Sequence, residues 1–222
     1  MNIKLLSLLG QFLALLLALP VLAQTEPELV NIRTVDPTII VELRYAGPRN
    51  LAQRPLYPPD MPALVRPSVA ARLRNAQTYL LARGLRLKIW DAYRPKAAHD
   101  QIWQMSRKTD YVADPADGFG SLHTWGVAID ATLVDKDGRE VAMPTDFDDF
   151  RPAAMLRYNG NDPGVRLHLT TLQRAMKLAG FYGLRTEWWH FVAKDWRKYG
   201  AISDDRGPSP VKDRPAQRSA AR

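Results

Sequence analysis

The stretch GSLHTWGVAIDATLVD, residues 120–135, joins a Ser, a His and an Asp to a run of small and apolar residues. From Gly126 onward the run is dominated by apolar and β-branched residues, which predicts a buried strand, and an Asp-Gly turn follows it. The whole chain has four histidines. His123, seven residues before Asp130, is therefore a candidate functional side chain.

The segments around this strand predict a mixture of helices and strands. Strands are expected at 38–45 (TIIVELRY) and at 85–93 (LRLKIWDAY), the second ending between Asp91 and Arg94, and a short turn and strand is expected at 185–192 (RTEWWHFV). Helices are expected from Pro67 to about Gly84, from Pro95 through Ala98, Ile102 and Met105, and from Leu169 to Ala179. Residues 143–165 are irregular and long enough to suggest a functional loop. Because no regular βαβ alternation is visible, we expect an α+β fold with one small, mainly antiparallel sheet flanked by helices.

The two ends of the chain differ from its middle. Lys4 precedes an apolar run from Leu5 to Leu19, and the small residue Ala23 follows, which is the pattern of a cleaved signal peptide at residues 1–23. Residues 203–222 are polar and rich in proline, which predicts a disordered tail. One domain over residues 24–202 remains, with no stable membrane span after cleavage. We expect an exported protein, in the periplasm.

Composition excludes some classes of protein. The chain has no cysteine, so an exported domain of this size must be held by burial, alone or with a metal, and not by disulfides. The formal charge of +8 falls to about +7 once Lys4 is removed, and the basic residues are scattered among acidic ones. A nucleic-acid-binding module would show a basic stripe, so no nucleic-acid partner is expected. No sequence pattern fixes an oligomeric state.

Two imidazoles and one carboxylate suggest a catalytic zinc site. His123, Asp130 and His190 are such a set, and three protein ligands leave the fourth position of zinc to water. Residues seven apart on a flat strand point to opposite faces, so His123 must lie before the strand, with Gly126 supplying a bend. Glu187 is a candidate base, but it shares a face with His190 only if that segment is twisted or helical. Each residue taken alone is more often structural.

Together the motifs SLHTWGVAID, EWWHF and WDAYRP resemble those of the zinc D-alanyl-D-alanine dipeptidases of the VanX type, in a wider family that includes the D,D-carboxypeptidases. The resemblance runs from about residue 43 to residue 192. It implies one Zn²⁺ per chain, at the sheet, with His123, Asp130 and His190 as its ligands. It also implies that Glu187 is the general base.

The resemblance assigns three more residues. Arg94 would stabilise the carbonyl oxygen of the scissile bond as it becomes negative. Ser121 and Asp148 would hold the amino end of the dipeptide, although Asp146 and Asp149 lie close enough to take the place of Asp148. A structural ion pair is the alternative role for Arg94.

The sequence thus predicts an exported zinc metallopeptidase that hydrolyses D-Ala-D-Ala dipeptide to free D-alanine, with a role in peptidoglycan turnover. A D,D- or L,D-carboxypeptidase that trims peptidoglycan stem peptides is the nearest alternative. A non-catalytic, zinc-dependent wall-binding domain is another. The acidic group expected at the amino end favours the dipeptidase, because a free dipeptide carries an ammonium there.

Overall fold

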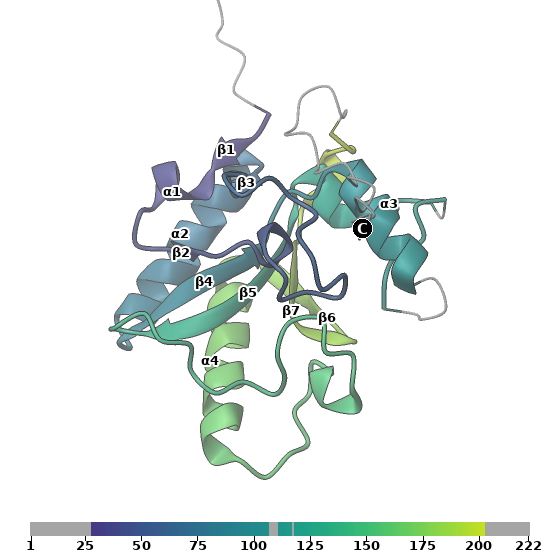
Figure 1. Ribbon diagram of the computed structural model, residues 1–222. Coiled ribbons are helices and arrows are strands. Elements are labelled where there is room, and N and C mark those ends of the chain that lie inside the picture. Colours follow the sequence, from purple (N-terminus) through teal and green to yellow (C-terminus); the bar gives the residue numbers. More distant parts are fainter. Residues whose placement is uncertain (1–27, 107–110, 117, 203–222) are drawn as a thin grey trace, which may run out of the picture.

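A five-stranded sheet occupies the centre of the molecule in the computed structural model (Figure 1), which describes residues 28–106, 111–116 and 118–202. The elements are β1 (Val30–Asn31), α1 (Ile32–Val35), β2 (Ile40–Val41), β3 (Leu64–Val65), α2 (Pro67–Leu81), β4 (Leu85–Asp91), α3 (Lys96–Ser106), β5 (Ala128–Asp135), α4 (Pro163–Leu178), β6 (Phe181–Leu184) and β7 (Glu187–Ala193), with 3₁₀ turns at Arg44–Ala46, Leu122–Trp125, Pro152–Ala154 and Trp196–Lys198. The predicted signal peptide and tail lie outside the described residues.

The order of the sheet is β2-β4-β5-β7-β6. The pairs β4–β5, β5–β7 and β6–β7 are antiparallel, and only β2 pairs with β4 in parallel. The expected single-domain α+β fold with a mainly antiparallel sheet is therefore confirmed. Long-range antiparallel pairing joins β5 to β7, which brings residues 128–130 beside residues 190–192.

Helices α2 and α4 pack against each other and against the sheet (Figure 1). Pro67 occupies the first turn of α2, where its missing N–H is not needed, and Asp162 caps α4 by accepting from the backbone of Gly164 and Val165. The residues that these helices bury are Val69, Ala70, Leu73, Ala76, Gln77 and Leu80 in α2 and Val165, Leu169, Leu172, Ala175 and Met176 in α4. Each large apolar side chain buried here contributes about 1.5–3 kcal/mol.

Aromatic side chains form the part of the buried core that packs against the irregular loop. The Trp90 ring of β4 lies 5.6 Å from Trp188 of β7 and 5.7 Å from Phe147 of the loop, measured between ring centroids. Trp189 in turn lies 5.9 Å from Phe147. Trp188 and Trp189 are core residues, with 0% and 1% of their surface exposed. This cluster anchors the loop at residues 145–150 on the sheet.

Two local predictions were wrong. The strand expected at 38–45 is only Ile40–Val41, because the chain leaves the sheet edge and turns at Arg44–Ala46. That turn buries Arg44, whose guanidinium pairs with Glu140 at 2.7 Å. Met105, expected on the inner face of α3, is 44% exposed, and Ser106 is buried instead.

Three short strands were not predicted. β1 and β3 have two residues each and pair with each other outside the main sheet, and β6 forms the sheet edge beside β7. Strands this short carry too few residues to show a period of two. Across residues 28–106, 111–116 and 118–202, no helix has the length and apolar character that a bilayer-crossing span requires.

Candidate functional site

The predicted zinc ligands come from two neighbouring strands and the turn before one of them. Asp130 of β5 and His190 of β7 are direct partners in the antiparallel pairing. His123 lies in the 3₁₀ turn at Leu122–Trp125, which ends at Gly126 with φ +69°. This left-handed glycine turns the chain from the 3₁₀ turn into β5, so that His123 and Asp130 meet although they are seven residues apart.

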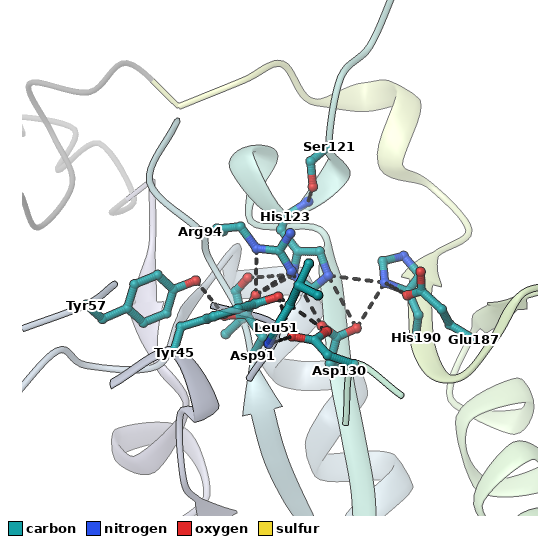
Figure 2. Close-up of polar contacts among 12 residues, drawn as sticks. Tyr45, Leu51, Tyr57, Asp91, Arg94, Ser121, His123, Asp130, Glu187 and His190 are labelled. Carbon is teal, nitrogen blue, oxygen red and sulfur yellow. Dashed lines mark hydrogen bonds and ion pairs between the residues drawn. The ribbon is translucent and has the colours of Figure 1, made fainter. Parts of the chain in front are cut away.

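The three side chains converge on one point (Figure 2). Each offers a ligand atom, and these atoms lie within 4.8 Å of one another. His123 Nε2 is 3.1 Å from His190 Nδ1 and 3.4 Å from Asp130 Oδ1, and His190 Nδ1 is 2.9 Å from the same oxygen. Burial alone would raise the pKa of Asp130, but the two imidazoles hold it well below its usual range.

A backbone contact fixes the orientation of His123. Its Nδ1 lies 2.8 Å from the carbonyl oxygen of Ala92. Because a carbonyl only accepts, Nδ1 carries the proton and the lone pair of Nε2 faces Asp130 and His190. A metal-ligating histidine commonly has its other ring nitrogen held in this way. The donor set of two imidazole nitrogens and one carboxylate therefore fits a zinc ion, as the residue types had suggested.

An irregularity in β7 places Glu187 on the same side as His190. Gly183 of β6 pairs with Phe191, but the next residue, Leu184, pairs with Glu187, so the intervening residues of β7 bulge out of register. Glu187 Oε2 consequently lies 3.8 Å from His190 Nδ1. The side chain is buried, and burial, with the nearby charge of Asp130, raises the pKa of Glu187 to about 8 in the absence of a metal.

Arg94 projects toward Asp130 from the segment after β4. Its Nη2 lies 3.6 Å from Asp130 Oδ2, and its Nε and Nη2 contact Asp91 Oδ2 at 2.9 and 2.8 Å. Asp91 is completely buried, and its other oxygen accepts a 2.7 Å hydrogen bond from Tyr57 (Figure 2). A register shift at Trp90 pairs Asp91 with Asp130. Asp91 and Tyr57 were not singled out from the sequence, although WDAYRP contains the first.

The structure separates Asp148 from its two rivals. Asp148 accepts hydrogen bonds from Leu51 N at 2.9 Å and the Tyr45 hydroxyl at 3.1 Å, and burial raises its pKa to about 7. It has a positive φ of 56°, unusual for a residue with a side chain. Asp146 is exposed, and Asp149 forms an ion pair with Arg151. Only Asp148 of the three faces the cavity described next.

One cavity, of about 220 Å³, is lined by all seven predicted site residues, namely Arg94, Ser121, His123, Asp130, Asp148, Glu187 and His190. Ser121 is buried there, and its Oγ accepts from the backbone N–H of His123 at 3.3 Å. The volume lies below the roughly 300–1,000 Å³ typical of sites for drug-sized ligands, which suits a small ligand. A larger cavity, of about 510 Å³, is lined by Asn31, Arg33 and residues from 41–49 and 59–63, and none of the seven lines it.

Comparison with known proteins gives concordant results. Residues 25–205 match the family model Peptidase_M15, described as D-ala-D-ala dipeptidase. The D-alanyl-D-alanine dipeptidase of Escherichia coli (strain K12) is 31% identical over 177 residues, which cover 80% of this chain and 90% of that protein. The enzyme of the same name from Enterococcus faecalis (strain ATCC 700802 / V583) is 29% identical over 150 residues, 58% of this chain and 72% of the relative.

A solved structure with a similar chain is that of the vancomycin resistance D,D-dipeptidase VanXYg in complex with a D-Ala-D-Ala phosphinate analog. It is 21% identical, covers 75% of this chain and 66% of its own, and superposes with a TM-score of 0.39.

Proposed function

The chain belongs to the D-ala-D-ala dipeptidase family, Peptidase_M15, and from that membership we propose that it hydrolyses D-alanyl-D-alanine to two molecules of D-alanine at a zinc centre. The observation that carries the proposal is the convergence of His123, Asp130 and His190 within 4.8 Å, in one cavity with Glu187 and Arg94. The proposal of a zinc ion does not rest on family membership alone, because the donor set itself suits zinc.

His123 Nε2, His190 Nδ1 and a carboxylate oxygen of Asp130 would hold the ion. When bound, zinc supplies a water whose pKa is lowered to about 7 and a Lewis acid that polarises the substrate carbonyl. The hydrogen bond from His123 to Ala92 keeps one ring nitrogen free for the metal. Asp130 is already ionised before a metal binds, because His123 and His190 keep its pKa low.

Glu187 is the proposed general base. Its Oε2 lies beside His190, so it can take a proton from the attacking water and deliver it to the nitrogen of the departing amine. Its pKa of about 8 without metal marks a carboxyl group in a poorly solvated place. A divalent cation in the site favours the ionised form of Glu187, which is the form that a base requires.

Arg94 is proposed to hold the carbonyl oxygen as negative charge develops on it. The guanidinium is buried and fixed by two contacts to Asp91, so it needs no reorganisation during the reaction. Such a preorganised donor is typically worth about 10²–10³ in kcat.

Asp148 and Ser121 are proposed to receive the amino end of the dipeptide. The carboxyl group of Asp148 already accepts two hydrogen bonds, and an incoming ammonium would favour its ionised form. An N-acylated stem peptide offers no ammonium and is larger than a dipeptide. The small cavity and the acidic group therefore favour a dipeptidase over a carboxypeptidase.

Export is a further part of the proposal. It is supported by the pattern of residues 1–23, with Lys4 before an apolar run that ends in small residues. Sequencing the N-terminus of the protein recovered from the periplasm should give a chain that begins at Gln24. A chain retained in the cytoplasm with Met1 intact would contradict export.

The hydrolysis is tested by D-alanine release from D-Ala-D-Ala by the purified protein, with and without a chelator. We expect chelation and His123→Ala to abolish release together with bound zinc, and Glu187→Ala to keep zinc but lose turnover. His168→Ala, which removes a histidine of α4 that contacts Ala142, is the matched control and should leave both unchanged. Full turnover in Glu187→Ala would remove its role as base, and hydrolysis of N-acylated stem peptides in preference to the dipeptide would favour a carboxypeptidase.

A further inference from the structure

Two aromatic side chains from separate segments stack against each other beside the cavity. Tyr111, from the segment after α3, and Phe150, from the loop that carries Asp148, both line the cavity. Their ring centroids are 4.8 Å apart, and the ring planes lie 16° from parallel. Both residues are partly exposed, whereas His123 and Asp130 are buried, with 2% of their surface exposed. Residues that line a cavity and also reach solvent form its rim, so the stack lies at the rim.

Each half of the stack has its own anchor. Phe150 lies against Trp189 of β7, with 6.2 Å between ring centroids, and Trp189 is buried in the core. Two residues after Tyr111, the carbonyl oxygen of Ala113 accepts a hydrogen bond from Nε2 of His99 in α3 at 3.0 Å. Stacked aromatic pairs are favourable beyond the area that they bury. The stack therefore joins a loop held on the sheet to a segment held on α3, and it closes the rim between them.

The stack borders the part of the cavity that is proposed to receive the amino end of the dipeptide. Phe150 follows Asp148 by two residues, so their Cα atoms are at most about 7 Å apart. Asp148 is fixed in this part of the lining by the hydrogen bonds that it accepts from Leu51 N and the Tyr45 hydroxyl. A substrate whose ammonium meets Asp148 thus has its amino end next to the two rings.

A group added to the amino nitrogen of the substrate would need the space that the two rings occupy. The cavity, of about 220 Å³, is already small. Phe150 cannot move inward, because Trp189 lies behind it, and Tyr111 is stacked on Phe150. Filling a packed aromatic contact with extra atoms forces side chains from their preferred positions, which is unfavourable.

We propose that the stacked rings of Tyr111 and Phe150 limit the size of the group on the amino nitrogen of the substrate, and that this steric limit acts in addition to the charge of Asp148. The proposal rests on the proposed dipeptidase function and names residues that determine its selectivity. The two requirements can be separated. A benzylated amine is bulky and still positively charged, whereas an acetylated nitrogen carries a small group and no charge.

The test compares kcat/KM of the zinc-loaded full chain for D-Ala-D-Ala, N-benzyl-D-Ala-D-Ala and N-acetyl-D-Ala-D-Ala, measured as release of D-alanine. The wild type should cleave both substituted dipeptides poorly. In Tyr111→Ala, kcat/KM for the benzyl dipeptide should rise relative to that for D-Ala-D-Ala by about ten-fold or more, since even one methylene of space gives about ten-fold discrimination. The ratio for the acetyl dipeptide should change less, because Asp148 still lacks an ammonium partner.

Other variants separate the rings from a general disturbance of the loop. Tyr111→Phe keeps the stack and should keep the selectivity of the wild type. Phe150→Ala should shift the benzyl ratio as Tyr111→Ala does, with some added loss on D-Ala-D-Ala because it adjoins Asp148. Tyr79→Ala makes the same substitution at a partly exposed tyrosine of α2 that packs on Arg83 outside the cavity, and it should leave the ratios unchanged.

Each outcome bears on one of the two proposals. If D-Ala-D-Ala is hydrolysed and Tyr111→Ala changes all three substrates by the same factor, the stack has only a structural role and the inference is overturned. Cleavage of the benzyl dipeptide by the wild type at the rate of D-Ala-D-Ala would overturn it as well.

If the wild-type protein hydrolyses none of the three, calorimetric titration of zinc-loaded Glu187→Gln with D-Ala-D-Ala and its benzyl derivative decides. Binding of D-Ala-D-Ala alone, extended to the benzyl derivative when Tyr111→Ala is added, would keep the steric limit and reject the reaction. Equal binding of both ligands before that addition, or binding of neither, rejects the steric limit together with the reaction.

Discussion

At the scale of single residues, Asp91 organises the candidate site without being a predicted ligand or base. It is fully buried and connects Tyr57 on one side to Arg94 on the other. His123 Nδ1 lies 3.5 Å from it as well. The Arg94 guanidinium has a longer contact, 3.6 Å, to Asp130 and lies over the Tyr45 ring, 5.0 Å from its centroid. The position of the guanidinium therefore depends on the carboxylate of Asp91.

Replacing Asp91 with Asn should affect turnover more than metal content. The variant keeps the volume of the side chain but leaves Arg94 without its main charge partner, which costs about 3–5 kcal/mol of stability for a buried pair. We expect kcat to fall by about 10²-fold, as for loss of a preorganised oxyanion donor, with zinc still bound. Tyr57→Phe, which removes one hydrogen bond to the same carboxylate, should cost only about 1 kcal/mol. Unchanged kcat in Asp91→Asn, with stability reduced, would make Asp91 purely structural.

The raised pKa of Asp148 predicts a pH dependence of stability. Burial raises this pKa from 3.8 to about 7, so the folded protein binds the proton more tightly than the unfolded chain does. The resulting stabilisation of the folded state is complete at pH values below the pKa of Asp148 in the unfolded chain, and it is lost as the pH rises from about 4 to about 7. The free energy of unfolding of metal-free Asp148→Asn, measured with urea, should therefore rise relative to that of the wild type by about 1–3 kcal/mol between pH 4 and pH 8.

Asp149→Asn is the control for this measurement, since Asp149 pairs with Arg151 outside the cavity. Its unfolding free energy should run parallel to that of the wild type across the same pH range. An Asp148→Asn curve that also ran parallel would show that the carboxyl group is not desolvated in the folded protein.

Some residues of the candidate site could be predicted from the sequence and others could not. His123, Asp130 and His190 stand out because imidazoles are rare in this chain and a carboxylate inside an apolar strand is unusual. Tyr57 lies in a segment with no such contrast, and its hydrogen-bond partner Asp91 is distant in the sequence. Contacts of this kind depend on tertiary packing.

At the scale of elements, two register shifts build the site at the ends of otherwise regular strands. One pairs Asp91 with Asp130, and the other brings Glu187 next to His190. The strands themselves were predictable from their apolar runs, as for β4 and β5. The shifts were not, because the residues that form them are ordinary strand residues, and pairing decides where an extra residue is accommodated.

Gly126 gives a test at this scale. It has φ +69°, and a Cβ added to it would lie 2.6 Å from Leu29 Cδ2, whereas Gly84 has φ +70° with nothing within 4 Å. Both Gly→Ala changes should cost about 1–2 kcal/mol for the left-handed conformation. Only Gly126→Ala should also weaken zinc binding, because it displaces the turn that carries His123. Equal zinc affinity in the two variants, measured by competition with a chelator, would show that the turn tolerates the shift.

At the scale of the whole molecule, the last described residues are tied back to the site. Ile202 is buried, and its N–H donates to the carbonyl oxygen of Thr124 at 3.0 Å. Arg66 donates to the carbonyl oxygen of Gly200 at 2.9 Å and lies over the Tyr199 ring. The expected domain boundary at residue 202 stays a prediction, but these contacts explain why it should lie there and not earlier.

Truncation tests the boundary. A chain that stops after residue 202 should keep the unfolding midpoint and the dipeptidase activity of the full chain, because the contacts of Arg66 and Thr124 remain. A chain that stops after residue 198 should unfold at a lower urea concentration and lose activity, since Thr124 adjoins His123. If removal of residues 203–222 alone destabilised the protein, the predicted disordered tail would be wrong.

The pairing of β5 with β7 spans only three residue pairs, and the last is Asp130 with His190. This short seam joins the part of the sheet formed by β2, β4 and β5 to the part formed by β6 and β7. A cation bound by His123, Asp130 and His190 would link β5 to β7 and stabilise this short pairing. Chelation should then accelerate amide hydrogen exchange along residues 128–130 and 190–192 before it reduces the protection of amides in α2. In that case the bound ion would also limit how often the sheet opens between β5 and β7.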